Sequence, residues 1–352
     1  MTKPPFKIRS RRRAARAVLG FLGIYFAVHF GFLLWLDYGP PRVRDPEYGK
    51  RISRAKSRAH EPSDRPVILV IGSSRTSMGV RPGVLADDPS SPLLVNVSLA
   101  GSGPVMERMA LRRALDDGLK PDAVIVEFWP AFLRENGTYH EEARIDPSRL
   151  RPVDSTIVLD YFRDPKNVEK VRRQYLFSPI YAHRKSIMNQ ASPGWLGYGQ
   201  RSDALWEKID DWGWLPGKTG ATPMELRGAR NAAAGYYIPL FANYEVSPVA
   251  DQALRDLVKD CRDRDIPVAL FYLPEAAEFR TFMPSAVQSQ ADSYLAAICE
   301  ELKLPLIDAR GWAADDELID GFHLTQSGAE QTTRKLGPAV TAAFPGLKRG
   351  SR

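Results

Sequence analysis

Residues 67–75 have the sequence VILVIGSSR, in which five consecutive apolar residues are followed by a glycine and two serines. A short apolar run that ends in glycine is typical of a strand buried on both faces of a parallel sheet. Strands that alternate with helices predict an α/β fold, with a parallel sheet covered on both faces. The chain has four further apolar runs (93–97, 123–128, 268–273 and 304–307), interleaved with stretches of helical spacing (106–119, 247–264, 286–302 and 327–343).

The stretch 137–245, between the third predicted strand and the helix near Pro248, contains no clear strand. It is too long for a simple crossover loop and too apolar for a linker. We therefore predict a helical insertion, which we expect beside the carboxyl ends of the strands, where α/β sheets bind ligands. Its helix-like segments lie near 165–175 and 181–189, and its tryptophans are Trp195, Trp206, Trp212 and Trp214.

The N-terminal region combines a basic block with an apolar segment. Residues 1–16 contain seven basic side chains and no acidic one, and residues 18–36, VLGFLGIYFAVHFGFLLWL, carry no charge. As a helix the apolar segment is roughly 28 Å long, close to the thickness of a bilayer core. No A-x-A-like cleavage site follows it, so we predict an uncleaved signal anchor over residues 17–36 rather than a cleaved signal peptide or a buried core helix. By the positive-inside rule, everything after Leu36 is outside the cytoplasm.

The net charge of +7 comes from the basic block, because the rest of the chain has 42 basic and 42 acidic side chains. This balance gives no electrostatic support for a nucleic-acid partner. Residues 37–65 are polar and proline-bearing, with no apolar periodicity. We interpret them as a tether that leads from the membrane to a domain at 66–346.

Ser74 follows the first predicted strand directly, in a Gly-Ser-Ser-Arg turn. A serine at a strand-to-helix turn holds its hydroxyl at the carboxyl edge of the sheet, near the free N–H groups of the helix start. This position suits a nucleophile, and Gly72 permits the tight turn. A helix cap or a structural turn is the alternative explanation for such a serine.

A nucleophilic serine needs a base within reach, and the base needs an acceptor that orients it. The chain has five histidines, of which His29 lies in the apolar segment and His60 in the expected tether. Of the other three, only His323 has a carboxylate three residues before it, Asp320. The pair lies between the fifth strand and the last helix, at the same sheet edge as Ser74. A surface loop with a capping aspartate and a solvated histidine is the alternative.

At this point the sequence resembles the SGNH (GDSL-type) hydrolase superfamily. Residues 72–74, GSS, are similar to block one of that family, and residues 320–323, DGFH, are similar to block five. The resemblance extends over the sheet, about residues 66–345, but not over the insertion. It implies a doubly wound sheet of five parallel strands in the order 2-1-3-4-5.

The resemblance also implies roles for individual residues. It makes Ser74 the nucleophile, His323 the base and Asp320 the group that orients the base. Block two of the family supplies a glycine N–H to the oxyanion hole, and Gly101 is the best match within residues 96–103, NVSLAGSG. The implied oxyanion donors are thus the N–H groups of Ser74 and Gly101.

Two departures from the family pattern affect the expected chemistry. Ser73 replaces the aspartate of block one, which resembles membrane-bound envelope members such as the lipoteichoic-acid D-alanylation protein. Block three offers an asparagine as third oxyanion donor, whereas here the third strand ends in EFWP at 127–130. Removal of one such donor costs about 10²–10³ in rate. We expect Glu127 to be a solvated strand end, with a carboxylate that faces the cleft as the alternative.

Two functions are consistent with these sequence features. The first is a membrane-anchored esterase or O-acyltransferase that acts through a serine acyl-enzyme on an acylated envelope glycan or polymer, with a membrane acyltransferase as a candidate partner. The second is a decayed domain of the same fold that serves as a glycan-binding or accessory protein. A dinucleotide enzyme is excluded, because no G-x-G-x-x-G follows the first strand.

The remaining residue types predict no cofactor and no metal. No spacing of cysteines and histidines matches a metal site. Cys261 and Cys299 each lie within a predicted amphipathic helix. We interpret them as small buried apolar residues, with a disulfide between them as the alternative in an exported domain.

Overall fold

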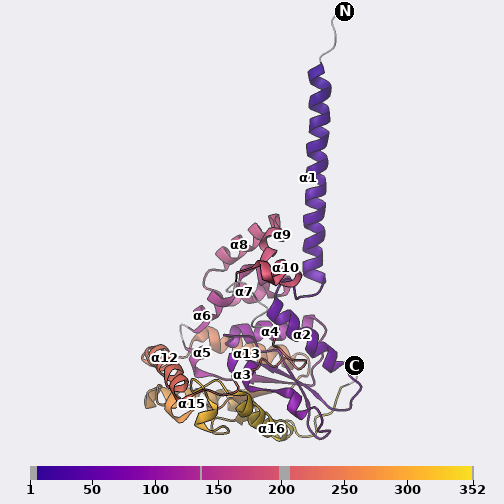
Figure 1. The fold of residues 1–352 in the computed structure, drawn as a ribbon. Helices are drawn as coiled ribbons and strands as arrows, with labels where there is room; N and C mark the ends of the chain where they lie inside the picture. Colours follow the sequence, from indigo (N-terminus) through magenta and orange to yellow (C-terminus); the bar gives the residue numbers. More distant parts are fainter. Residues whose placement is uncertain (1–5, 135–136, 198–206, 351–352) are drawn as a thin grey trace, which may run out of the picture.

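The computed structural model describes residues 6–134, 137–197 and 207–350. At its centre is a parallel sheet of five strands in the order β2-β1-β3-β4-β5, which confirms the predicted fold class and strand order (Figure 1). The strand from the opening motif lies inside the sheet, paired with β2 on one side and β3 on the other. The strands are β1 (Val67–Ile71), β2 (Leu93–Asn96), β3 (Ala123–Glu127), β4 (Val268–Tyr272) and β5 (Leu306–Asp308).

The sheet is covered on both faces because its apolar strands have two sides to bury. Along β1, Leu69 packs into one apolar core and its neighbours Ile68 and Val70 into the other. The first core is closed by α2 (Pro46–Ala59), α4 (Pro104–Asp116), α13 (Pro248–Arg262) and α15 (Ser285–Glu301). The second is closed by the short helix η1 (Pro82–Leu85) and α16 (Gln326–Ala343).

The helix α1 (Phe6–Tyr38) projects away from the sheet domain (Figure 1). The most apolar 18-residue window within residues 11–38 has a mean hydropathy of 2.1, and none of that window is buried. Within the described part of the chain it is the one helix that is long and apolar enough to cross a membrane. These properties fit either a signal anchor or a signal peptide.

The segment that we expected to be a tether instead contains a helix of the sheet domain. Asp45 caps α2 by accepting a hydrogen bond from the Tyr48 N–H. Tyr48, Ile52 and Ala55 are buried against the sheet. Their spacing of four and three residues places them on one helical face. The prediction missed this stripe because charged residues surround it, and one of them, Arg51, is itself fully buried.

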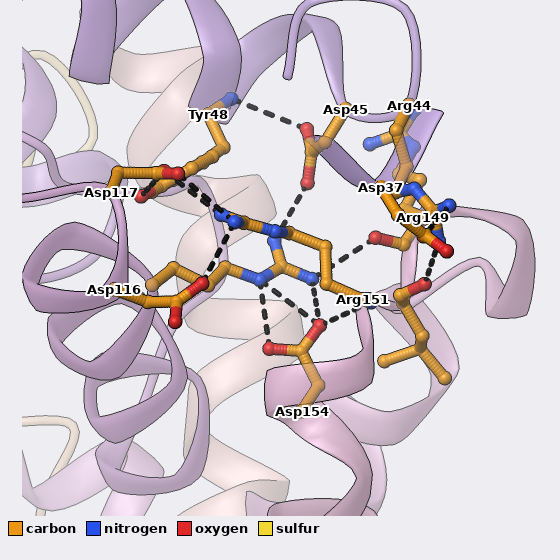
Figure 2. Close-up of polar contacts among 11 residues, drawn as sticks. Asp37, Arg44, Asp45, Tyr48, Asp116, Asp117, Arg149, Arg151 and Asp154 are labelled. Atoms are coloured by element: carbon orange, nitrogen blue, oxygen red, sulfur yellow. Dashed lines mark hydrogen bonds and ion pairs between the residues drawn. The ribbon is translucent and has the colours of Figure 1, made fainter. Parts of the chain in front are cut away.

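A cluster of arginines and aspartates fastens α1 and α2 to α4 and to the insertion (Figure 2). Arg113 on α4 forms ion pairs with Asp45 at 3.0 Å and Asp154 at 2.6 Å. Burial acts to lower the pKa of Arg113, but the two carboxylates outweigh it and raise the pKa above its ordinary value. At the end of α1, Asp37 pairs with Arg44, which also donates to a backbone carbonyl of the insertion. These contacts hold α1 in a defined orientation against the domain.

The described residues of the insertion contain helices and no strand, as predicted, although residues 207–222 form turns and loops, and only part of the insertion lies at the carboxyl edge. Its two ends meet in an antiparallel bridge between Arg134 and Val246. α12 packs beside the edge, whereas α8 to α10 lie against the end of α1 (Figure 1). Trp206 is outside the described residues. The short helix α5 (Pro130–Leu133) precedes the insertion, whose helices are α6 (Gly137–Arg144), α7 (Ser155–Tyr161), α8 (Pro165–Phe177), α9 (Pro179–Ala182), α10 (Arg184–Ala191) and α12 (Pro223–Phe241).

Candidate active site

Ser74 is the first residue of α3 (Ser74–Gly79), directly after the carboxyl end of β1. Ser73 caps the helix, since its hydroxyl accepts a hydrogen bond from the Arg75 N–H at 3.1 Å. Gly72 is required because a Cβ there would stand 2.3 Å from the Thr76 hydroxyl oxygen. The Ser74 side chain is half-buried, and it starts a helix whose first N–H groups have no partner within the helix.

The structure brings the three residues expected from the sequence together. The Ser74 Oγ lies 2.8 Å from the His323 Nε2, and the His323 Nδ1 lies 2.7 Å from an Asp320 carboxylate oxygen. These distances confirm the expected geometry. The neighbouring serines are engaged elsewhere: Ser73 donates to Glu127, and the Ser77 hydroxyl accepts from Arg51.

The charge on Asp320 determines which nitrogen of His323 holds a proton. Burial acts to raise the pKa of Asp320, but hydrogen bonds from the His323 ring and backbone and from the Phe322 N–H outweigh it and lower the pKa. An ionised carboxylate only accepts hydrogen bonds, so the proton of a neutral imidazole is on Nδ1. The lone pair of Nε2 then faces the Ser74 hydroxyl, as a general base requires.

The loop that carries His323 is held in shape by a short bridge and an aromatic cluster. Leu318 and Leu324 form an antiparallel bridge on either side of the turn. Gly321 has a φ of +95°, and a Cβ there would stand 2.7 Å from the Phe279 Cβ, so glycine is required. Phe322 packs its ring against Trp129, Tyr237 and Phe279, with centroids 5.4, 5.1 and 4.9 Å apart.

Glu127 is buried rather than solvated, so our expectation for this residue was wrong. Its carboxylate accepts hydrogen bonds from the Ser73 N–H and the Thr76 hydroxyl, each at 2.6 Å, and from the Ser73 hydroxyl at 3.1 Å. The side chain is only 1% exposed. Glu127 therefore fixes the turn that presents Ser74, although it does not contact the Ser74 hydroxyl itself.

A second buried carboxylate, that of Glu275, stabilises the same turn through Arg75. Arg75 is fully buried, with its guanidinium 3.2 Å from Glu275 and 4.6 Å from the centre of the Trp129 ring. The Trp129 indole N–H also donates to Glu275, at 3.0 Å. Burial raises the pKa of Glu275, and Arg75 opposes that shift. In the sequence, one glutamate stands at the carboxyl end of β3 and the other shortly after β4. Glutamates at such positions are usually exposed to solvent, so nothing in the sequence indicated that these two are buried.

The loop with Gly101 is joined to the nucleophile turn, because the Leu99 N–H donates to the Gly72 carbonyl at 2.9 Å. Gly101 has a φ of +77°, and a Cβ there would stand 2.4 Å from the Nε of Arg144. Arg144, at the end of α6, thus packs its guanidinium against the Cα of Gly101. Glu141 anchors α6 by accepting from the N–H groups of residues 103 and 106, and burial raises its pKa to about 8.

The three tryptophans of the insertion that the structure describes make their contacts away from the Ser74 hydroxyl. Trp214 is buried and donates to the Met78 carbonyl, and Trp212 lies beneath the Arg58 guanidinium. Trp195 is 79% exposed but follows α10, on the side of α1. Aromatic rings at the site come instead from the end of β3, from α12 and from the histidine loop. Cys261 and Cys299 are both free thiols, so they form no disulfide.

No protein-family model and no curated protein matches the sequence. Among solved structures, the chain is similar to a GDSL-like lipase from Bacteroides thetaiotaomicron (10% identity, TM-score 0.36, covering 84% of this chain and 99% of that one). It is also similar to an aryl esterase from M. smegmatis (13%, 0.34, 79% and 100%). A third is a carbohydrate acetylesterase family member from Sinorhizobium meliloti (12%, 0.34, 80% and 99%). At such low identity, roles are assigned to individual residues from the geometry of the site and not from these similarities.

Proposed function

We propose that this chain is a serine-dependent esterase or O-acyltransferase, anchored by α1 and facing outward, that acts on an acylated envelope glycan or polymer. The observation that carries the proposal is the continuous hydrogen-bonded series from Ser74 through His323 to Asp320, at 2.8 and 2.7 Å. This arrangement of hydroxyl, imidazole and carboxylate activates a serine for acyl transfer.

In the proposed reaction, the His323 Nε2 takes the proton of Ser74 while Oγ forms a bond to the ester carbonyl carbon. The resulting oxyanion accepts hydrogen bonds from the N–H groups of Ser74 and Gly101. The carbon–oxygen bond to the alcohol then breaks, and His323 returns the proton to the leaving oxygen. Water or a sugar hydroxyl attacks the acyl-enzyme with His323 again as base, which gives hydrolysis or transfer respectively.

The acceptor specificity follows from the setting rather than from the triad. A domain attached to α1 works at a membrane surface, where envelope polymers are assembled and modified. In this proposal, a membrane acyltransferase supplies the acyl group or receives the product. The chemistry at Ser74 needs no cofactor and no metal, because the base, its orienting carboxylate and the backbone donors are all side chains or N–H groups of this chain.

A decayed binding domain is the second candidate, favoured by the lack of an asparagine after β3. Reaction with a fluorophosphonate probe, which requires an activated serine, separates the two. We expect stoichiometric labelling of Ser74 and turnover of an aryl acetate. A folded chain that neither reacts with the probe nor turns over the ester is a binding module.

We expect Asp320→Asn to lower kcat for an aryl acetate by about 10³–10⁴-fold, because the amide no longer holds the imidazole in the required tautomer. Asp316→Asn, an exposed change on the same loop, should leave kcat unchanged. Because the folded-state pKa of Asp320 lies below its ordinary value of 3.8, its ionised form stabilises the fold above that pH and the contribution is lost as the pH falls below it. Asp320→Asn should therefore reduce the dependence of stability on pH in the acid range. An unchanged kcat would contradict the assigned role.

We also propose that Arg144 replaces the missing third oxyanion donor. Arg144→Ala should lower kcat by about 10²-fold with a neutral aryl acetate while KM stays nearly constant, because the donor acts on charge that develops in the transition state. Added guanidinium ion should restore part of the rate. Arg227→Ala, an exposed arginine on α12, is the control. A loss that appears only with anionic esters would show that Arg144 binds substrate charge instead.

A further inference from the structure

The corner formed by α8, α9 and α10 exposes large apolar side chains beside α1. Leu176, Phe177, Ile180, Tyr181 and Trp195, which we call the apolar corner, have exposed fractions of 43, 75, 37, 64 and 79%. Figure 1 shows α9 and α10 next to the domain-side end of α1. Scattered single apolar side chains are ordinary on a protein surface, but a contiguous group marks an interaction site.

The apolar corner touches α1 within its apolar span. The Tyr25 hydroxyl donates to the Phe177 carbonyl at 3.3 Å, and the rings of Phe32 and His183 lie 6.3 Å apart. Counted along the helix axis from Leu36, Phe32 is about 6 Å and Tyr25 about 16 Å into the span. The apolar half of a bilayer is about 15 Å deep, so Phe32 lies within the outer leaflet and Tyr25 lies near the centre of the bilayer. Whatever packs beside Tyr25 and Phe32 therefore lies at hydrocarbon depth when α1 crosses a membrane.

From these positions we propose that the apolar corner is inserted in the outer leaflet and contacts lipid acyl chains. The inference rests on the proposed anchoring by α1. The side chains that face outward from this corner are the kind that a bilayer accommodates, with aromatic rings suited to the interface. A protein partner would have to cover the corner within the membrane, at the same depth as the exposed apolar face of α1.

The positive charge around the apolar corner also favours contact with a lipid bilayer. Residues 163–185 carry seven basic side chains and two acidic ones. The Arg184 guanidinium lies 3.8 Å over the Tyr181 ring, and Arg173 is 71% exposed on α8. Long basic side chains of this kind extend from an apolar position to the lipid phosphates.

Insertion at two places has a consequence for the domain. With α1 as the only attachment, the tilt of the domain would follow the tilt of a single helix in the bilayer. The apolar corner adds a second attachment that is tied to the sheet domain by the buried pairs of Arg113 with Asp45 and Asp154. The domain is therefore held at one tilt, with α12 at the end away from α1 (Figure 1).

The test places an environment-sensitive fluorophore at single cysteines in the full chain, in bilayer discs of phosphatidylcholine and phosphatidylglycerol. In a background with Cys261→Ala and Cys299→Ala, Phe177→Cys and Tyr181→Cys report on the corner. Val28→Cys on α1 and Tyr236→Cys on α12 are matched references, since the native side chains are 53 and 51% exposed. Far-ultraviolet circular dichroism verifies that each variant is folded.

We expect brominated acyl chains to quench the fluorophore at 177 and 181 to at least half the extent seen at 28, and not at 236. Quenching at 28 without quenching at 177 and 181 overturns the inference while the anchoring stands. No quenching at any of the four positions removes the anchoring and the inference together. Neither result touches the serine chemistry, which the fluorophosphonate probe measures separately.

Discussion

We expect Ser74→Ala to abolish fluorophosphonate labelling and to lower kcat for ester turnover by about 10⁴–10⁶-fold. The change removes the oxygen that lies 2.8 Å from the His323 Nε2. No other hydroxyl on the turn is placed to substitute for it, because Ser73 and Ser77 bond to Glu127 and Arg51. The measurement is the rate of aryl acetate hydrolysis together with the stoichiometry of probe attachment.

Ser77→Ala is the matched control, since it removes a hydroxyl three residues further along the same short helix. It should retain labelling at Ser74, although it costs the hydrogen bond from Arg51. The thermal unfolding of Ser74→Ala should resemble that of the unmodified chain, because a half-buried hydroxyl contributes little to stability. Labelling of Ser74→Ala at the rate of the unmodified chain would show that another residue is the nucleophile.

Glu127→Gln is expected to lower the free energy of unfolding by about 3–5 kcal/mol, as is typical when one partner of a buried charge pair is removed. The carboxylate accepts from three donors on the nucleophile turn and lies 3.7 Å from Arg75. An amide brings an N–H₂ group against those donors and leaves Arg75 with one counter-charge fewer. Urea denaturation in detergent measures the change.

Glu330→Gln provides the comparison on the surface. Its carboxylate pairs with Arg334 one turn along α16, and both side chains are exposed, so the expected loss in stability is much smaller than for Glu127→Gln. Because Glu127 positions the turn, Glu127→Gln should also slow probe labelling of the molecules that remain folded. A loss in stability equal to that of Glu330→Gln would mean that the buried carboxylate does not hold the turn.

The sheet could be predicted from sequence because burial on both faces leaves a local mark. The runs are almost wholly apolar, as in VILVI at 67–71, and the segments between them show the spacing of apolar residues that is typical of helices. The residues of the candidate triad could also be predicted, since Ser74 follows a strand and Asp320 precedes His323 by only three positions. In contrast, the helix α2 was missed, because its apolar stripe is only one face of an otherwise charged segment.

The buried charges were the larger omission. Three buried charged residues come from separate parts of the chain: Arg75, Glu127 and Glu275. Each is of a type that is usually found at the solvated surface. A charge is buried at acceptable cost only when its partners and hydrogen bonds are supplied around it. The fold of the sheet brings those partners together, so no local sequence pattern predicts the burial of these charges. For the same reason, the position of Arg144 over Gly101 could not be predicted from the sequence.

By itself, the sequence determined the five strands and the helices between them, the apolar character of α1, and the residue types that carry the proposed chemistry. Only the tertiary structure decided that Ser74 and His323, which are 249 positions apart, lie within 2.8 Å. Parallel strands place all their carboxyl ends at one edge, and the loop after β5 folds back across that edge. Periodicity reports how one segment meets solvent and core, whereas a distance between two remote side chains depends on how all the segments pack together.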